Sequence, residues 1–173
     1  MQEIFILRHG HAEDNEGSTV KNDFDRKLTE EGKEKIRKIS LFLNKLEEEI
    51  ELVISSPYIR AKETAEILIS NLTPKPNLKI EEFLSSGASC KEIVKGLMPY
   101  LSLKKVLLVG HAPDLSTFLG KLIGAEHVKL KKGALAKIEL NNSIELSGEL
   151  AWLITHKVVK EFKLKEKAVI KGI

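Results

Sequence analysis

Four residues that could act together on a phosphoryl group stand at or just beyond the ends of short apolar runs. The four are Arg8, His9, Arg60 and His111. The runs themselves, at residues 3–7, 52–54 and 105–109, are typical of buried β-strands. Ligands in open α/β sheets lie at the carboxyl ends of the strands. If the three strands are parallel, the four side chains converge on one crevice.

The chemistry of these four side chains is coherent. A guanidinium presents a planar fork of N–H donors that matches phosphate oxygens, so Arg8 and Arg60 could together hold one phosphoryl group. A neutral imidazole is a competent nucleophile at phosphorus near neutral pH, which suits His9. A protonated His111 could stabilise charge on the transferring group. Phosphoryl transfer depends mainly on positioning and electrostatics, so this set could suffice without a metal ion.

Arginine is rare in this chain, which suggests that an arginine stands where lysine would not serve. Of the 28 basic residues only four are arginines: Arg8, Arg26, Arg37 and Arg60. Ser56 and Pro57 are typical of the N-cap and the first position of a helix. A helix that begins there places Arg60 in its first turn, where free backbone N–H groups and the helix dipole also favour an anion.

Strand-like and helix-like segments alternate along the chain, which favours an α/β domain. Thr29 is a predicted helix N-cap, with Glu30 and Glu31 in the first turn. With 173 residues and no linker or repeat, the chain is predicted to form one domain, residues 1–173. The other predicted elements are a helix from Pro57 to about Ser70, a strand from Leu78 to Glu81, helices over 91–101 and from about 114 to 124, and a C-terminal hairpin of strands 133–140 and 148–155 joined through Asn141 and Asn142.

The composition argues against several classes of protein. Hydrophobic residues make up 42%, so disorder is not expected, and the single cysteine, Cys90, cannot pair within the chain. No run approaches the roughly 18 apolar residues that a membrane span needs, and residues 1–3 lack the basic start of a signal peptide. A cytoplasmic protein is therefore expected. The net charge of +3 arises from mixed charges without a dense basic stripe, which disfavours nucleic-acid binding.

Several ordered motifs resemble the histidine phosphatase superfamily, which includes the phosphoglycerate mutases, and within it the small SixA-type phosphohistidine phosphatases. The signature Leu7-Arg8-His9-Gly10 alone is a weak signal, whereas the ordered set at matching intervals is specific. The resemblance covers nearly the whole chain. Its further motifs are Leu28 to Gly32, Ser55 to Ala61 with Thr64 and Ala65, Leu108 to Asp114, Lys132 to Ala136, and Ala151 to Leu153.

The resemblance implies a function as well as a fold. It implies a protein phosphohistidine phosphatase in which His9 becomes phosphorylated, Arg8 and Arg60 hold the phosphate and His111 completes the pocket. It also implies a three-layer α/β sandwich with a mostly parallel central sheet, helices on both faces, and no metal or other cofactor. The expected partner is a histidine-phosphorylated protein, either a phosphotransfer domain or a phosphocarrier, and the expected state is a monomer.

Two further residues are candidates because of where relatives carry functional groups. Glu82 lies in the region where the superfamily often places the acid that protonates the leaving group. Asn15 stands where some relatives have an asparagine that contacts phosphate. The short chain also leaves little room for the insertions that cover the site in larger relatives, and an open groove suits a phosphohistidine on the surface of another protein.

Other functions remain open at this point. A small-molecule phosphomonoesterase of the same superfamily would use the same four residues, whereas a mutase would need a lid to protect its intermediate from water. A metallohydrolase could use the pair His9 and His11, with His111 as a third ligand. That alternative leaves Arg8 and Arg60 beside a cation, and metal barrels that open with such a pair need about 250 residues. A non-catalytic binding module would gain nothing from His9 next to Arg8.

Overall fold

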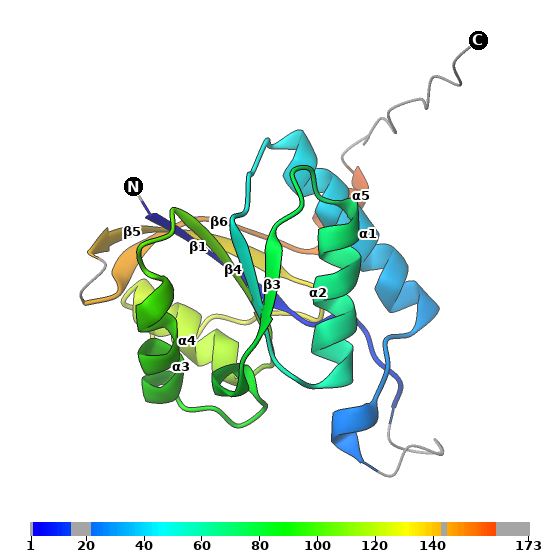
Figure 1. Cartoon of the computed structure of the whole chain (residues 1–173), viewed down its shortest axis with the longest axis horizontal. Helices are drawn as coiled ribbons and strands as arrows, with labels where there is room; N and C mark the ends of the chain where they lie inside the picture. The colour runs from blue at the N-terminus through cyan, green and yellow to red at the C-terminus, as the bar shows by residue number, and fades with distance from the viewer. Residues whose placement is uncertain (1, 15–21, 143–144, 162–173) are drawn as a thin grey trace.

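The central element is one six-stranded mixed sheet with the strand order β3-β2-β4-β1-β5-β6 (Figure 1). The computed structural model describes residues 2–14, 22–142 and 145–161. The first four strands in the chain pair in parallel, and the last two form an antiparallel hairpin. The strands are β1 (Gln2–Arg8), β2 (Leu52–Ser55), β3 (Asn77–Ile80), β4 (Lys105–Gly110), β5 (Leu135–Asn142) and β6 (Ser147–Ile154).

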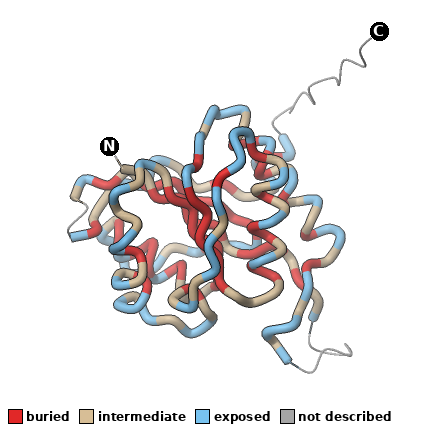
Figure 2. The backbone as a smooth tube through the Cα atoms, in the orientation of Figure 1, coloured by how far each residue is buried: buried red, intermediate tan, exposed pale blue. Residues whose placement is uncertain are grey.

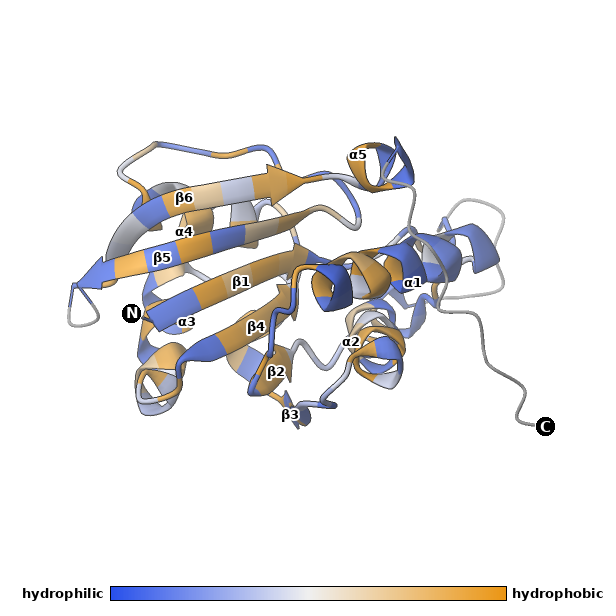
Figure 3. Ribbon diagram, turned by 90° about the horizontal axis from the view of Figure 1, so that it is seen from above, coloured by the Kyte–Doolittle hydropathy of each residue, from blue (hydrophilic) through white to orange (hydrophobic). Residues whose placement is uncertain are grey.

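Helices cover both faces of the sheet, so the fold is the three-layer α/β sandwich that the resemblance implies. In β1 the side chains alternate: Ile4 and Ile6 pack with α3 and α4, and Phe5 and Leu7 pack with α1, α2 and α5. Figures 2 and 3 show these buried, apolar central strands between the two helical layers. The helices are α1 (Glu30–Lys45), α2 (Ile59–Asn71), α3 (Cys90–Leu97), α4 (Asp114–Leu122) and α5 (His156–Glu161), with short 3₁₀ turns η1 (Asp23–Asp25), η2 (Glu82–Leu84) and η3 (Met98–Tyr100).

The register of the parallel strands brings three chain segments out at one edge of the sheet. Arg8 at the end of β1 pairs with Gly110 at the end of β4, and Ser55 at the end of β2 pairs with Val109. Because these strands are hydrogen-bonded neighbours and run in the same direction, the residues that follow them begin side by side. This edge is where the four phosphate-site candidates were expected.

The start of α1 confirms the predicted helix cap. The Thr29 side chain accepts a hydrogen bond from the Gly32 N–H, which satisfies one free donor of the first turn. A Cβ at Gly32 would collide with the carbonyl of His11, so glycine is required for the close approach of this turn to the strand-end loop. The cap therefore fixes α1 against the segment that follows His9.

Several predicted boundaries differ from the structure. Helix α2 begins at Ile59 rather than Pro57, because Tyr58 has an extended backbone with φ −61° and ψ 134°. The Ser56 hydroxyl contacts His111 and accepts the Tyr58 N–H. Asn141 and Asn142 belong to β5 and not to the hairpin connection, and the strand predicted from Leu78 starts one residue earlier. The predicted helix over 91–101 is α3 followed by η3. Helix α5 was not predicted; it packs on α1 through the buried Val159.

An ion-pair network ties the loop after α1 to the sheet at the end remote from the candidate site. The Glu48 carboxylate contacts Lys105 of β4 at 2.6 Å and Lys137 of β5 at 2.7 Å, and both lysines also face Glu3 of β1. The Glu48 side chain is 8% exposed. Burial alone would raise the pKa of this carboxyl, but the two lysines outweigh burial and hold the pKa below its ordinary value.

Among the residues described, no helix is long and apolar enough to cross a membrane.

We predict that Glu48→Gln lowers the free energy of unfolding by roughly 2–3 kcal/mol, the lower end for a broken buried pair, because Glu3 still faces both lysines. Since the folded-state pKa of Glu48 is lowered, its contribution is present above about pH 4.3 and is lost as the pH falls through that lowered pKa. Urea unfolding at several pH values measures both effects. Glu49→Gln, at an exposed neighbour, is the matched control. Equal stability of the two variants would contradict the prediction.

Candidate active site

Backbone hydrogen bonds fix the residues that follow the parallel strands. The Arg8 N–H donates to the Ala134 carbonyl at 3.1 Å, and the His9 N–H donates to the Gly110 carbonyl at 3.0 Å. The Ser56 N–H donates to the Val109 carbonyl at 2.9 Å. The sheet pairing therefore continues past the ends of β1 and β2, and the side chains at these positions start from a rigid backbone.

His9 presents one unprotonated ring nitrogen to the site. Its Nδ1 lies 2.7 Å from the Gly10 carbonyl oxygen, which can only accept, so Nδ1 carries the proton. Its Nε2 accepts from the Arg60 Nε–H at 3.3 Å. The residue is 6% exposed. The Nε2 lone pair thus points at a guanidinium rather than at bulk solvent.

Burial keeps the His9 imidazole neutral. It lowers the pKa of His9 to about 3, because the charged form loses its hydration, and the nearby His111, Arg60 and Arg8 disfavour a further positive charge. The hydrogen bond to the Gly10 carbonyl acts in the opposite direction and is outweighed. At neutral pH the ring therefore retains the lone pair that nucleophilic attack requires.

His111 lies across from His9, with their ring centroids 5.2 Å apart. Its Nδ1 lies 3.3 Å from Arg60 Nη2, which can only donate, so the proton is on Nε2 and is donated to Ser56 Oγ at 2.8 Å. Burial, and then the charge of Arg60, lower the pKa of His111 to about 4. From the sequence a protonated His111 was expected, whereas burial, and then the charge of Arg60, keep this imidazole neutral.

Arg60 joins the two histidines. It is 4% exposed and comes from the first turn of α2, as predicted. Its Nε faces His9 and its Nη2 faces His111 at 3.3 Å each, and its guanidinium carbon lies 4.9 Å from the centre of the Tyr58 ring. Arg60 therefore places a fixed positive charge between two neutral bases.

Arg8 has a buried donor without a partner among the described residues. Its Nη1 donates to the Leu130 carbonyl at 2.8 Å, whereas its Nε is buried without a hydrogen bond to any described residue. Burial and the charge of Arg60 lower the pKa of Arg8 from its ordinary value. A buried N–H without an acceptor costs free energy, so this donor favours a ligand oxygen that would accept from it.

The candidate acid Glu82 makes no hydrogen bond or ion pair with this cluster among the described residues. Glu82 is exposed at the start of η2, and its carboxylate accepts a hydrogen bond from Ser85 Oγ at 2.9 Å. The Leu84 carbonyl at the end of η2 lies beside Gly110, so this turn passes the end of β4. Asn15 lies outside the described residues.

The sequence did not indicate three residues that the structure adds to the site. Thr64 accepts from the Gly10 N–H and donates to the Arg60 carbonyl, so it links the loop after β1 to α2. Ser56 holds His111, although the sequence suggested a helix cap there. Asp23, in the polar loop before α1, contacts the guanidinium of Arg60. A signal for Asp23 was available in the scarcity of arginine, because Asp23 pairs with two of the four arginines, Arg26 and Arg60.

The pair that suggested a metallohydrolase is not assembled as a ligand set. His11 Nδ1 lies 3.4 Å from Thr29 Oγ1, at the start of α1. Within residues 2–14, 22–142 and 145–161, no group of three or more histidine, cysteine or acidic side chains is arranged to hold a metal ion.

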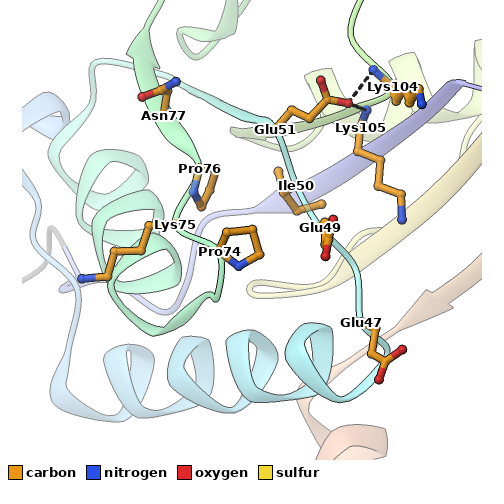
Figure 4. Close-up of a pocket in the computed structure, with 10 residues that line it drawn as sticks. All are labelled: Glu47, Glu49, Ile50, Glu51, Pro74, Lys75, Pro76, Asn77, Lys104 and Lys105. Atoms are coloured by element: carbon orange, nitrogen blue, oxygen red, sulfur yellow. Dashed lines mark hydrogen bonds between the residues drawn. The ribbon is translucent and has the colours of Figure 1, made fainter.

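A surface hollow lies at the opposite end of the parallel strands (Figure 4). Its lining includes Glu51, Pro76 and Lys105, which lie just before or at the start of β2, β3 and β4. Glu51 accepts there from the backbone N–H of Lys105. The hollow is therefore separate from the cluster at the carboxyl ends of the strands.

Comparison with known proteins gives a consistent result. Residues 4–85 match the family model of the histidine phosphatase superfamily (branch 1). An uncharacterized protein of Picosynechococcus sp. is 30% identical over 139 residues, which cover 77% of this chain and 82% of that protein. The solved structure of the protein histidine phosphatase SixA complexed with tungstate has a TM-score of 0.83 at 23% identity, covering 91% of this chain and 99% of that one. The α-ribazole phosphatase of Shigella flexneri has a TM-score of 0.72 at 18% identity, covering 90% and 97%.

We predict that His9 and His111 titrate far below the ordinary histidine pKa of about 6.5, at about 3 and about 4. Between pH 6.5 and these values the unfolded chain binds more protons than the folded one, so these two residues reduce stability as the pH falls. Nitrogen NMR of the imidazole rings measures the titration, with the urea-unfolded chain as reference. Titration of His9 near pH 6.5 in the folded protein would contradict the described burial.

Proposed function

The chain belongs to the histidine phosphatase superfamily, and we propose that it hydrolyses phosphohistidine on a protein through a covalent phospho-His9 intermediate. The observation that carries the proposal is the neutral Nε2 of His9 facing the Arg60 guanidinium at 3.3 Å. A nucleophile next to a fixed cation suits attack on an anionic phosphoryl group, since the cation attracts the group and leaves the lone pair unprotonated.

The first step transfers the phosphoryl group to His9. The Nε2 lone pair attacks phosphorus, the bond from phosphorus to the substrate imidazole nitrogen breaks, and the imidazole leaves with a proton. Arg60 and the unpartnered Nε of Arg8 bind the phosphoryl oxygens. The anionic group raises the pKa of His111 by electrostatic attraction, so that its Nδ1 gains a proton and donates to the same group.

The second step releases inorganic phosphate. A water oxygen attacks phosphorus and the water gives a proton to the Glu82 carboxylate, which lost its own proton to the leaving imidazole in the first step. The bond to His9 Nε2 breaks, and the ring returns to its neutral form with the proton retained on Nδ1 by the Gly10 carbonyl. Glu82 is the proposed acid for the leaving group, and its exposed position suits a residue that approaches only when substrate is bound. No step in this scheme needs a metal ion, because arginines neutralise the charge.

A protein-borne phosphohistidine is the proposed substrate because the structure resembles that of SixA over almost the full length of both chains. A small-molecule phosphate ester is the second candidate substrate, since the α-ribazole phosphatase, which has a similar fold, is named for such a compound. Both candidates use His9, Arg8, Arg60 and His111 in the same way, so they differ in substrate and not in chemistry.

We predict that His9→Ala abolishes turnover and the phosphoenzyme, because it removes the imidazole whose Nε2 accepts from Arg60 Nε and attacks phosphorus in this scheme. The measurement is a time course with a histidine-phosphorylated phosphotransfer protein and with p-nitrophenyl phosphate, in the presence of EDTA. His127→Ala, at an exposed histidine, is the control.

The assay tests the proposed substrate and the proposed mechanism separately. Fast loss of phosphohistidine with slow ester cleavage supports the protein substrate, and the reverse moves the substrate to a small molecule. Near-normal activity of His9→Ala would refute the nucleophile. Loss of wild-type activity in EDTA, restored by zinc, would refute the metal-independent scheme.

We predict that Arg8→Ala lowers kcat/KM by roughly 30- to 1000-fold, equivalent to about 2–4 kcal/mol for one preorganised donor. Arg8→Lys should restore only part of the activity, since an ammonium keeps the charge but lacks the planar fork. The matched control is Arg37→Ala, which removes an exposed arginine that pairs with Glu34 on α1. Activity of Arg8→Ala equal to that of the control would show that the buried Nε does not bind substrate.

A further inference from the structure

The Arg60 guanidinium uses two different edges for two different sets of partners. Nε and Nη2 lie on one edge of the group, and these atoms face His9 Nε2 and His111 Nδ1. Nη1 and Nη2 form the other fork, at the tip of the side chain. The edge toward the histidines has the parallel pair of N–H donors that binds a phosphate or carboxylate through two oxygens.

Asp23 occupies the tip of the guanidinium. Its backbone carbonyl accepts from Arg60 Nη1 at 2.6 Å, and its Oδ2 accepts from Arg60 Nη2 at 2.9 Å. Burial would raise the pKa of the Asp23 carboxyl, but hydrogen bonds from Arg26 and Arg60 hold that pKa below its usual value. The carboxylate is therefore charged at neutral pH and binds the end of Arg60 that does not face the nucleophile.

Other contacts hold Asp23 in place. Arg26 Nη1 donates to Asp23 Oδ1 at 2.9 Å, and Arg26 Nε donates to the Glu13 carbonyl. The next residue, Phe24, packs against Tyr58 with ring centroids 4.9 Å apart. Tyr58 in turn packs edge-on against His111 at 4.8 Å. The 3₁₀ turn η1 is thus attached to the site at two points: Asp23 pairs with two arginines, and Phe24 packs on the ring of Tyr58, which packs on His111. This turn lies beside the start of α2 (Figure 1).

We propose that Asp23 is a positioning residue: it holds the tip of Arg60 so that the edge with Nε and Nη2 stays turned toward the phosphoryl group at His9. This inference rests on the proposed function. An arginine side chain has several rotatable bonds, and fixing it before the substrate arrives removes part of the entropic cost of binding. Asp23 contacts no reacting atom in this scheme and acts through Arg60.

The direction in which a substitution of Asp23 changes the affinity for an anion distinguishes a positioning role from competition with that anion. A carboxylate that blocked the anion site would have to be displaced by phosphate, so its removal would tighten anion binding. A carboxylate that orients Arg60 from the other end stays in place when phosphate binds, so its removal weakens binding. The geometry points to the second case, because the histidine-facing edge of Arg60 carries no contact to Asp23 other than through the shared Nη2.

The experiment compares Asp23→Asn with Asp25→Asn, since both remove one acidic charge from η1 and Asp25 is exposed. The first readout is the Kd for tungstate, the oxyanion bound in the similar SixA structure. We expect Asp23→Asn to weaken tungstate binding and lower kcat/KM by roughly tenfold, and Asp25→Asn to change either by less than about twofold. Thermal unfolding of the two variants should coincide. Arg26→Gln, which removes only the outer partner, should show a smaller loss.

A double-mutant cycle tests whether the effect passes through Arg60. In an Arg60→Lys background, which has no fork to orient, Asp23→Asn should change tungstate binding by less than about twofold. Equal effects of Asp23→Asn and Asp25→Asn, tighter tungstate binding by Asp23→Asn, or an undiminished effect in the Arg60→Lys background would each overturn the inference. Wild-type protein that neither binds tungstate nor hydrolyses either substrate would instead overturn the proposed function, and this inference with it.

Discussion

The burial of one guanidinium between two imidazoles is the interaction on which the site depends. Arg60 brings a fixed positive charge into a place where water is largely excluded, and burial, with a smaller contribution from this charge, keeps His9 and His111 neutral. The N–H donors of Arg60 point at ring lone pairs of the two histidines, and such lone pairs are weaker hydrogen-bond acceptors for a guanidinium than anionic oxygens. The site is therefore arranged for an anion, and Asp23 compensates the charge of Arg60 only from the outer end of the guanidinium.

The sheet supplies the rigidity that this arrangement needs. Hydrogen-bonded neighbours β1, β4 and β2 end level with one another, so Arg8, His9 and His111 leave the sheet from adjacent positions. Helix α2 then returns Arg60 to the same edge, and Thr64 one turn later binds the loop after His9. At the opposite end, the buried network around Glu48 ties the loop after α1 to three strands. Stability and chemistry are thus placed at opposite ends of the same strands.

Much of the fold could be predicted from local patterns. The apolar runs identified β1, β2 and β4, the Thr29 cap identified the start of α1, and the alternation of elements indicated an α/β domain, whose mostly parallel sheet the family resemblance implied. Errors arose where tertiary contacts overrode a local preference. Ser56 has the side chain of a helix cap, but its hydroxyl contacts His111, and the extended backbone of Tyr58 delays the start of α2 to Ile59. Helix α5 was missed because its burial depends on contact with α1, far away in the sequence.

The sequence by itself determined which groups are available for chemistry: two histidines and two arginines that follow apolar runs, in a chain whose other basic residues are lysines except for Arg26 and Arg37. Residue type and position relative to strand ends are local properties, and they are written directly in the chain. Only the tertiary structure decided the protonation of His9 and His111, the burial of Arg8 Nε without a partner among the described residues, and the contact of Asp23 with Arg60. Each of these depends on which side chains exclude water and which donors meet across distant segments, and burial and direction exist only once the chain has folded.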